Sequence, residues 1–266
     1  MTAKLTITDI KDMKARRERI ACLTVYDAGF ARILEQSAVD VMLVGDSLGM
    51  VVQGKESTLP VTLDEMVYHS RCVSAANQRA LMVVDMPFMS YASPETAVLN
   101  AGRLMKEGGA HAVKLEGGRP ILEAVKRLSQ AGIPVCAHLG LLPQSVNKYG
   151  GYRVQGRDPQ QAQEIVEDAV ALQRAGADML VLECVPRSLA QNILSVVDIP
   201  VIGIGAGSDC DGQVLVLYDM LGITQGKLPR FVHNFLDGQR SIGDAVAAYV
   251  RAVKNGDFPR PEHSYD

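Results

Sequence analysis

The five cysteines of this 266-residue chain form no CxxC pair, so the sequence offers no basis for a thiolate zinc site. Their number is odd and they are widely spread, which also argues against a disulfide framework. They are Cys22, Cys72, Cys136, Cys184 and Cys210. We interpret most of them as small buried apolar side chains of a protein in a reducing compartment.

The chain also lacks an excess of basic residues: 27 Lys and Arg stand against 30 Asp and Glu, and the net charge is −3. A nucleic-acid partner is therefore not expected, and the basic run at residues 14–19 is typical of a solvated helix face. No apolar run is long enough to span a membrane, and no charged stretch followed by an apolar segment marks the N-terminus. We expect a cytoplasmic protein without membrane contact.

Eight short apolar segments are present instead, and they alternate with stretches of helical character. The segments are Cys22–Tyr26, Val41–Val44, Leu81–Val84, Ala112–Leu115, Val135–Leu139, Met179–Leu182, Val201–Ile204 and Val214–Leu217. Each is rich in Val, Ile or Leu, as expected for a strand that is buried on both faces. The eighth is the weakest prediction, because it could equally begin a helix.

The intervening helices carry recognisable start and stop signals. The clearest are Pro94–Lys106, Pro120–Gln130 and Gln160–Arg174. The first follows a Ser-Pro-Glu start, and all three end at a glycine that can adopt the left-handed cap conformation. Strict alternation predicts a parallel sheet with helices outside, and eight units favour a closed (β/α)₈ TIM barrel over an open sheet. No low-complexity linker interrupts the pattern, so we expect one domain over residues 1–266.

Two segments fall outside the repeat. Thr6–Ile20 is predicted to be an extra N-terminal helix, and Ile242–Asn255 an amphipathic C-terminal helix, which is a candidate subunit interface. The polar tail Pro259–Asp266 is expected to be poorly ordered unless it docks on a neighbour.

Acidic residues directly follow most of the predicted strands. They are Asp27, Asp46, Asp85, Glu116 and Glu183, and His138 ends the fifth strand. The active site of a TIM barrel lies at the carboxyl ends of its strands, so these side chains are expected to converge on one mouth. A single Asp in such a place could merely cap the next helix. As a set, these residues favour a catalytic rim.

Converged carboxylates repel each other unless a cation or shared protons neutralise them. Oxygen ligands suit Mg²⁺ or Mn²⁺ better than zinc. Asp46, Asp85 and Glu116 follow strands two, three and four, so they can share one metal ion.

Lys114 lies two residues before Glu116, so both side chains should point to the same face of the fourth strand. The lysine could bind a substrate carboxylate, form a Schiff base, or only make a salt bridge to Glu116 or Glu183. His138 could be a satisfied core histidine or a residue that faces the substrate.

Three further segments border the expected mouth. The glycine-rich run 203–207 superficially resembles a phosphate cradle, but a tight turn after the seventh strand explains it better. The long connection 140–158 is a candidate lid, and 49–60 is a second one.

Taken together, several motifs resemble the ketopantoate hydroxymethyltransferase family in order and spacing, over about residues 5 to 264. The motifs cover residues 44–49 (VGDSLG), 85–88 (DMPF), 113–118 (VKLEGG), 138–145 (HLGLLPQS), 182–186 (LECVP), 203–207 (GIGAG), 222–224 (GIT) and 233–236 (HNFL). Each motif alone is weak, but their combination is highly specific.

The resemblance implies that 5,10-methylenetetrahydrofolate, 3-methyl-2-oxobutanoate and water give 2-dehydropantoate and tetrahydrofolate, the first step towards pantothenate. It implies Mg²⁺ held by Asp46 and Asp85, with Glu116 as a direct or water-mediated ligand. Substrate contacts are expected from these two aspartates, Ser47, Lys114 and His138, and Glu183 is the expected proton acceptor. The resemblance also implies a homo-oligomer, a decamer.

Three other readings stay open from the sequence alone. The nearest is another Mg²⁺-dependent, enolate-forming lyase of the isocitrate lyase or phosphoenolpyruvate mutase type. A Schiff-base aldolase that uses Lys114 is the second. The third is a catalytically silent barrel that serves in binding or assembly, which the convergent acids disfavour.

Overall fold

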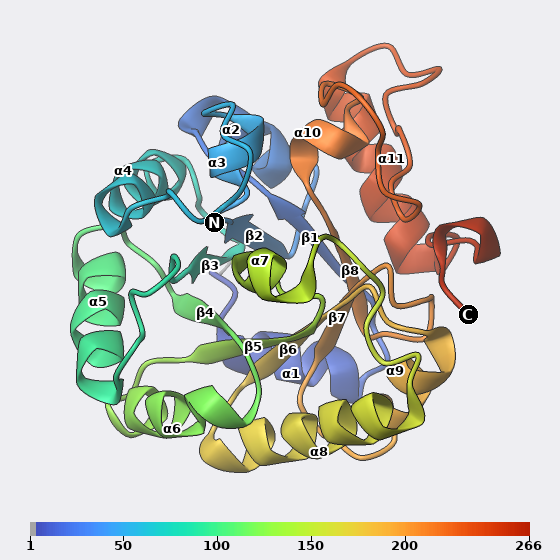
Figure 1. Ribbon diagram of the computed structural model, residues 1–266. Helices are drawn as coiled ribbons and strands as arrows, with labels where there is room; N and C mark the ends of the chain where they lie inside the picture. Colours follow the sequence, from blue (N-terminus) through green and yellow to red (C-terminus); the bar gives the residue numbers. More distant parts are fainter. Residues whose placement is uncertain (1–3) are drawn as a thin grey trace.

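The computed structural model describes residues 4–266, which form a closed barrel of eight parallel strands (Figure 1). The strands are β1 (Ile20–Thr24), β2 (Val41–Val44), β3 (Leu81–Asp85), β4 (Ala112–Glu116), β5 (Val135–Gly140), β6 (Met179–Glu183), β7 (Val201–Ile204) and β8 (Gly212–Leu215). They follow one another around the barrel in chain order, and β8 pairs with β1 to close it. The predicted (β/α)₈ barrel is confirmed.

The first strand lies two residues earlier than its predicted bounds, and so does the eighth. The eighth begins at Gly212 and ends at Leu215, after which the short helix α10 (Leu217–Met220) follows. The apolar pattern did not include Gly212 and Gln213. A Cβ atom on Gly212 would lie 2.4 Å from the carbonyl oxygen of Ile20, so the barrel closes where only a glycine fits.

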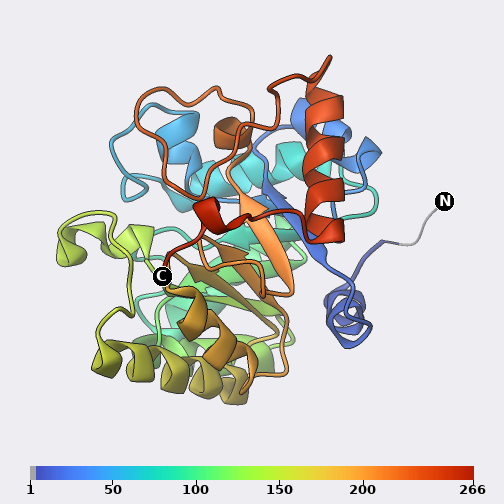
Figure 2. The same cartoon turned by 90° about the vertical axis from the view of Figure 1, so that its right-hand side faces the viewer.

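Helices surround the barrel or lie at its two ends (Figure 1 and Figure 2). Besides α10 they are α1 (Ile7–Ala15), α2 (Ala28–Gln36), α3 (Leu48–Val51), α4 (Leu63–Ser74), α5 (Pro94–Lys106), α6 (Leu122–Gln130), α7 (Val146–Tyr149), α8 (Pro159–Ala175), α9 (Arg187–Leu194) and α11 (Ile242–Asn255). The predicted bounds of α5 and α11 are confirmed to the residue. The start predicted at Pro120 lies in a 3₁₀ turn, Arg119–Ile121, that leads into α6.

The N-terminal helix ends five residues earlier than predicted. Arg17 adopts a left-handed conformation with φ 56°, which stops the helix and directs the chain into β1. The remaining helix lies against the amino ends of the strands: Lys11 Nζ contacts Asp178 at 2.6 Å, and Lys14 Nζ donates to the carbonyl of Ile199 at 2.9 Å. Figure 2 shows α1 at the opposite end of the barrel from α7.

The apolar face of the C-terminal helix packs within its own chain. That face packs on β1 and α2, and Tyr249 is fully buried there. The Tyr249 hydroxyl donates to the carbonyls of Cys22 (2.8 Å) and Gln213 (2.9 Å). The apolar face of α11 is therefore used within the subunit, and the role of this helix as a subunit interface stays a prediction.

The C-terminal tail is ordered, contrary to the prediction from its polarity. Pro261–His263 form a 3₁₀ turn, and Tyr265 pairs with Pro186 in a short parallel bridge. The carbonyl of Tyr265 accepts a hydrogen bond from the backbone N–H of Arg187 at 2.9 Å. These partners are distant in sequence, so local composition could not reveal them.

No helix within residues 4–266 is both long enough and apolar enough to cross a membrane.

Candidate active site

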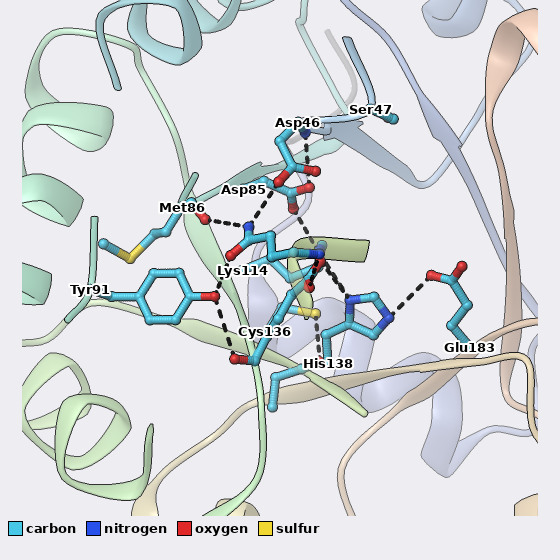
Figure 3. A network of polar contacts seen from close by, with 12 residues as sticks. Asp46, Ser47, Asp85, Met86, Tyr91, Lys114, Cys136, His138 and Glu183 are labelled. Atoms are coloured by element: carbon cyan, nitrogen blue, oxygen red, sulfur yellow. Dashed lines mark hydrogen bonds and ion pairs between the residues drawn. The ribbon is translucent and has the colours of Figure 1, made fainter. Parts of the chain in front are cut away.

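A cavity of about 170 Å³ opens at the carboxyl ends of the strands. Its lining includes six ionisable side chains from five neighbouring strands or the loops that directly follow them: Asp46, Asp85, Lys114, Glu116, His138 and Glu183. Parallel pairing brings them together, because Asp85 is in register with Lys114, and Glu116 with His138. The predicted convergence of these residues is confirmed (Figure 3).

Asp27 is the exception among the predicted rim carboxylates. It is the N-cap of α2, where Oδ1 accepts a hydrogen bond from the backbone N–H of Phe30 at 2.9 Å, and it does not line the cavity. The capping alternative therefore holds for Asp27, and its inclusion in the rim set was wrong.

Lys114 is the central cation of the site and is only 4% exposed. Its Nζ lies 3.0 Å from Asp85 Oδ1, 3.3 Å from His138 Nδ1 and 3.9 Å from Glu116 Oε1. The main ion pair is thus with Asp85 rather than with Glu116 or Glu183. Burial alone would lower the pKa of Lys114, but the neighbouring carboxylates outweigh burial and raise it. A lysine held in its protonated form is a poor Schiff-base nucleophile.

The ionised form of Asp46 is disfavoured by its surroundings. Burial raises its pKa well above the usual value, and repulsion from Asp85 and Glu116 raises it further. Its backbone N–H donates to Asp85 Oδ2 at 3.0 Å, which holds the two aspartates side by side. The cavity is lined by five carboxylates, four of them in this cluster, but by only one lysine and one histidine, so a bound cation would relieve the repulsion.

His138 lies between two carboxylates and is 2% exposed. Its Nδ1 is 3.5 Å from Glu116 Oε1, and its Nε2 is 3.2 Å from Glu183 Oε2 in a contact that is close but poorly aligned for a hydrogen bond. Burial, the largest influence, lowers the pKa of His138, as does Lys114, yet the two glutamates outweigh them and raise it. The ring is therefore part of the cavity wall, with its Nε2 turned towards Glu183 (Figure 3).

The pKa of Glu116 is lowered, whereas that of His138 is raised. Burial raises its pKa, but His138, Lys114 and the backbone N–H of Gln144 outweigh burial and lower it. The ionised carboxylate is thus available for a cation.

Gln144 is a site residue to which the sequence analysis gave no role. Its side-chain amide donates to Asp46 Oδ2 at 2.8 Å and to the carbonyl of Met86 at 2.9 Å. Its backbone N–H donates to Glu116 Oε2 at 3.0 Å, and its Oε1 accepts a hydrogen bond from Tyr91. The only signal in the sequence was its place in the segment 138–145.

The two segments predicted to be lids both border the cavity. Met50 comes from one and Tyr152 from the other, and the Tyr152 hydroxyl lies 3.5 Å from Met50 Sδ. Ser47 also lines the cavity, with Oγ 2.9 Å from the Tyr26 hydroxyl. The glycine-rich run forms a tight turn, since Gly205 has φ 62° and packs against aromatic rings.

The donor set fits a hard divalent cation that completes its coordination with water or substrate. Within residues 4–266, no group of three or more His, Cys, Asp or Glu side chains is arranged to enclose a metal by itself. Mg²⁺ does not need such a cage, because it commonly binds one or two carboxylates and takes its other ligands from substrate and water. Asp85 Oδ1 is buried, accepts no hydrogen bond and has only its ion pair with Lys114.

Comparison with known proteins agrees with this geometry. The family model described as ketopantoate hydroxymethyltransferase matches residues 4–261. The chain is 60% identical to the 3-methyl-2-oxobutanoate hydroxymethyltransferase of Nitrosococcus oceani over 98% of this chain and 99% of that protein. It is 57% identical to the enzyme of the same name from Alkalilimnicola ehrlichii, over 98% and 94% of the two chains.

Solved structures show the same fold at low identity. A phosphonopyruvate hydrolase in complex with oxalate and Mg²⁺ has a TM-score of 0.62 and 11% identity, covering 97% of this chain and 93% of the other. The extent and identity of the sequence matches are much greater. The chain therefore belongs to the ketopantoate hydroxymethyltransferase family and is a transferase.

Proposed function

We propose that this transferase adds a hydroxymethyl group to 3-methyl-2-oxobutanoate, with the carbon from 5,10-methylenetetrahydrofolate and the oxygen from water, giving 2-dehydropantoate and tetrahydrofolate. The observation that carries the proposal is the cavity itself, in which one protonated lysine is surrounded by carboxylates from adjacent strands. The names of the relatives support the substrate and the product class.

Asp46 and Asp85 are the proposed ligands of Mg²⁺, with Glu116 bound directly or through water. When bound, the cation polarises the keto group and stabilises the enolate that forms next to it. A 2-oxo acid and oxalate both present two oxygens on adjacent carbons, and a protein of the same fold binds oxalate together with Mg²⁺. That complex supports a divalent metal in this cavity.

Lys114 and Ser47 are proposed to bind and orient the substrate. The lysine supplies the positive charge that a substrate carboxylate needs among so many acids. Ser47 Oγ is held by the Tyr26 hydroxyl and can donate to a substrate oxygen. Together they fix the substrate with its C3–H bond directed at a base.

Glu183 is the proposed base that takes the proton from C3. It lies at the end of β6 and is less buried than the other acids, with 14% of its side chain exposed. His138, 3.2 Å away and itself a proposed substrate contact, can stabilise the ionised glutamate and hold its carboxylate in place. Loss of the C3 proton leaves an electron pair on C3 that bonds to the methylene carbon of the folate. Both C–N bonds of that carbon break, water supplies the hydroxyl oxygen, and the two folate nitrogens take up the protons released from C3 and from water.

The decisive experiment follows the C3 proton of 3-methyl-2-oxobutanoate by NMR in D₂O without folate. Wild-type protein with Mg²⁺ should exchange this proton, and protein treated with EDTA should not. Glu183→Gln should slow the exchange by about a hundredfold or more, as expected when a general base is removed, while Mn²⁺ binding persists. Unchanged exchange in Glu183→Gln would eliminate this residue as the base.

The alternative is a Mg²⁺-dependent lyase of the phosphoenolpyruvate mutase or isocitrate lyase type, which the fold neighbours suggest. Product formation separates the two functions. The proposed transferase makes 2-dehydropantoate only when methylenetetrahydrofolate is present, whereas a lyase would cleave its substrate without folate.

A further inference from the structure

A fifth carboxylate faces the same cavity and has no part in the proposed chemistry. Asp219, in α10, is 9% exposed and lines the cavity with Pro229 and Phe231. Thr224 Oγ1 donates to its Oδ1 at 2.6 Å. Within residues 4–266, Oδ2 accepts no hydrogen bond, and no lysine, arginine or histidine forms a salt bridge with this carboxylate.

Helix α10 is fixed to the substrate side of the cavity by a short chain of hydrogen bonds. The backbone N–H of Leu217 donates to Thr24 Oγ1 at 3.0 Å, and the Tyr26 hydroxyl donates to the same oxygen at 2.8 Å. Tyr26 in turn contacts Ser47 Oγ at 2.9 Å. Asp219 therefore has a defined position relative to Ser47.

The environment of Asp219 favours a ligand that donates hydrogen bonds. Burial raises the pKa of this carboxyl group, and only the hydrogen bond from Thr224 opposes the effect. A partly desolvated carboxylate without a cation is unfavourable unless donors satisfy it. An anionic 2-oxo acid would be repelled here, so the second substrate is the better candidate.

We propose that Asp219 binds the pterin ring of the folate co-substrate. This ring carries a ring N–H and a 2-amino group on one edge, and two adjacent donors match the two oxygens of a carboxylate, as a guanidinium does. Asp219 Oδ1 can accept a second hydrogen bond beside that of Thr224, because a carboxylate oxygen has two lone pairs. Pro229 and Phe231 offer apolar surface to the ring.

This inference rests on the proposed function, because it assumes a folate donor. It explains how one cavity holds two substrates: the acidic cluster around Lys114 binds the 2-oxo acid, and Asp219 recognises the neutral ring of the other. The competing explanation is that Asp219 only closes the turn to Thr224.

The first test is tetrahydrofolate binding, measured by calorimetry with saturating Mg²⁺ and 3-methyl-2-oxobutanoate. Asp219→Asn keeps an acceptor for Thr224 but replaces the free oxygen with an amide that faces the donors of the pterin. It should weaken binding about tenfold to a hundredfold, as expected for hydrogen bonds to a charged group. Deuterium exchange at C3 without folate should stay at the wild-type rate.

Thr224→Val is the matched control, since it removes the hydrogen bond of the turn and retains both carboxylate oxygens. Its tetrahydrofolate affinity should stay close to wild type. The inference is overturned if Asp219→Asn binds as tightly as wild type, or if both variants lose the same affinity, which would indicate a role in the turn alone.

A second measurement needs no variant. A tetrahydrofolate analogue with a methyl group in place of the 2-amino group lacks one donor, so the wild-type protein should bind it about tenfold or more weakly. Equal affinity for the two compounds would also overturn the inference, as would normal C3 exchange in a protein that does not bind tetrahydrofolate. Failure of the proposed function is distinct, because wild-type protein would then show no metal-dependent exchange.

Discussion

Among single side chains, Gln144 has the most connections to the acidic cluster without lining the cavity itself. It links Asp46, Glu116 and the carbonyl of Met86, and it receives a hydrogen bond from Tyr91. Partners behind metal ligands orient the ligand oxygens, and their loss typically costs about ten- to a hundredfold in metal affinity. Gln144 is therefore expected to act as a positioning residue.

We expect Gln144→Leu to weaken Mn²⁺ binding by about tenfold, because Asp46 loses its amide donor while the side-chain size is nearly kept. Electron paramagnetic resonance of free Mn²⁺ measures the affinity directly. Tyr91→Phe serves as the control. It removes only the hydrogen bond from the Tyr91 hydroxyl to Gln144 and keeps the hydrogen bonds that the Gln144 amide donates, so it should change the Mn²⁺ affinity much less. Wild-type affinity in Gln144→Leu would show that Asp46 does not depend on this amide.

The sequence predicted the acidic residues of the site because each one lies within two residues of the end of an apolar strand. Asp46, Asp85 and Glu116 could thus be placed on neighbouring strands from periodicity alone. Gln144 and Asp219 could not, because their contacts depend on how loops fold back over the mouth. Asp27 was misplaced for a local reason, since a carboxylate after a strand also makes a good helix cap.

At the level of elements, the C-terminal tail supports the loop that follows β6. Tyr265 pairs with Pro186, and Arg187 donates to the tail. This loop begins at Cys184, whose φ of 48° is unusual for a residue with a side chain and directly follows Glu183. The tail therefore helps to hold the backbone beside the proposed base.

Removal of residues 259–266 is expected to slow C3 deuterium exchange by about tenfold or more, since small displacements of a reacting group are costly. Mn²⁺ binding should persist, because none of the proposed metal ligands lies in the tail or its loop. Circular dichroism would verify that the barrel still forms. An exchange rate equal to that of the full chain would mean that the loop keeps its conformation unaided.

Element bounds were predictable wherever local signals were strong. The bounds of α5 and α11 were correct because caps and periodicity agree at both ends. The end of α1 was not predicted, because Arg17 gives no local sign of its left-handed conformation. The tail was missed because its order comes from partners about 80 residues away.

At the scale of the whole molecule, one half-buried histidine makes folding stability depend on pH. His111 Nδ1 accepts a hydrogen bond from the backbone N–H of Met82 at 2.9 Å, at the junction with β4. Burial, aided by Lys4, lowers the pKa of His111 to about 4. The unfolded chain binds a proton near pH 6.5, so unfolding is favoured as the pH falls from about 6.5 to 4.

The denaturation midpoint in urea should accordingly fall between pH 7 and pH 5. Part of this loss should disappear in His111→Asn, in which an amide oxygen accepts from Met82 but does not titrate in this range. The comparison of both proteins at both pH values isolates the histidine contribution from that of the other groups. An identical pH dependence in the two proteins would assign the loss to residues elsewhere.

The closed barrel was predictable from the number of its strands and their alternation with helices. The association of subunits was not predictable in this way. The decamer that the resemblance implies stays a prediction, and the apolar face of α11 is already used within the subunit.

The positions of the two chain ends have a practical consequence for work with this enzyme. Helix α1 lies against the amino ends of the strands, whereas Tyr265 lies beside the loop that follows Glu183. An affinity tag fused after Asp266 would crowd the entrance to the reaction chamber and strain the segment that supports it. A tag placed before the first helix, or immobilisation through it, would leave that entrance open to both substrates.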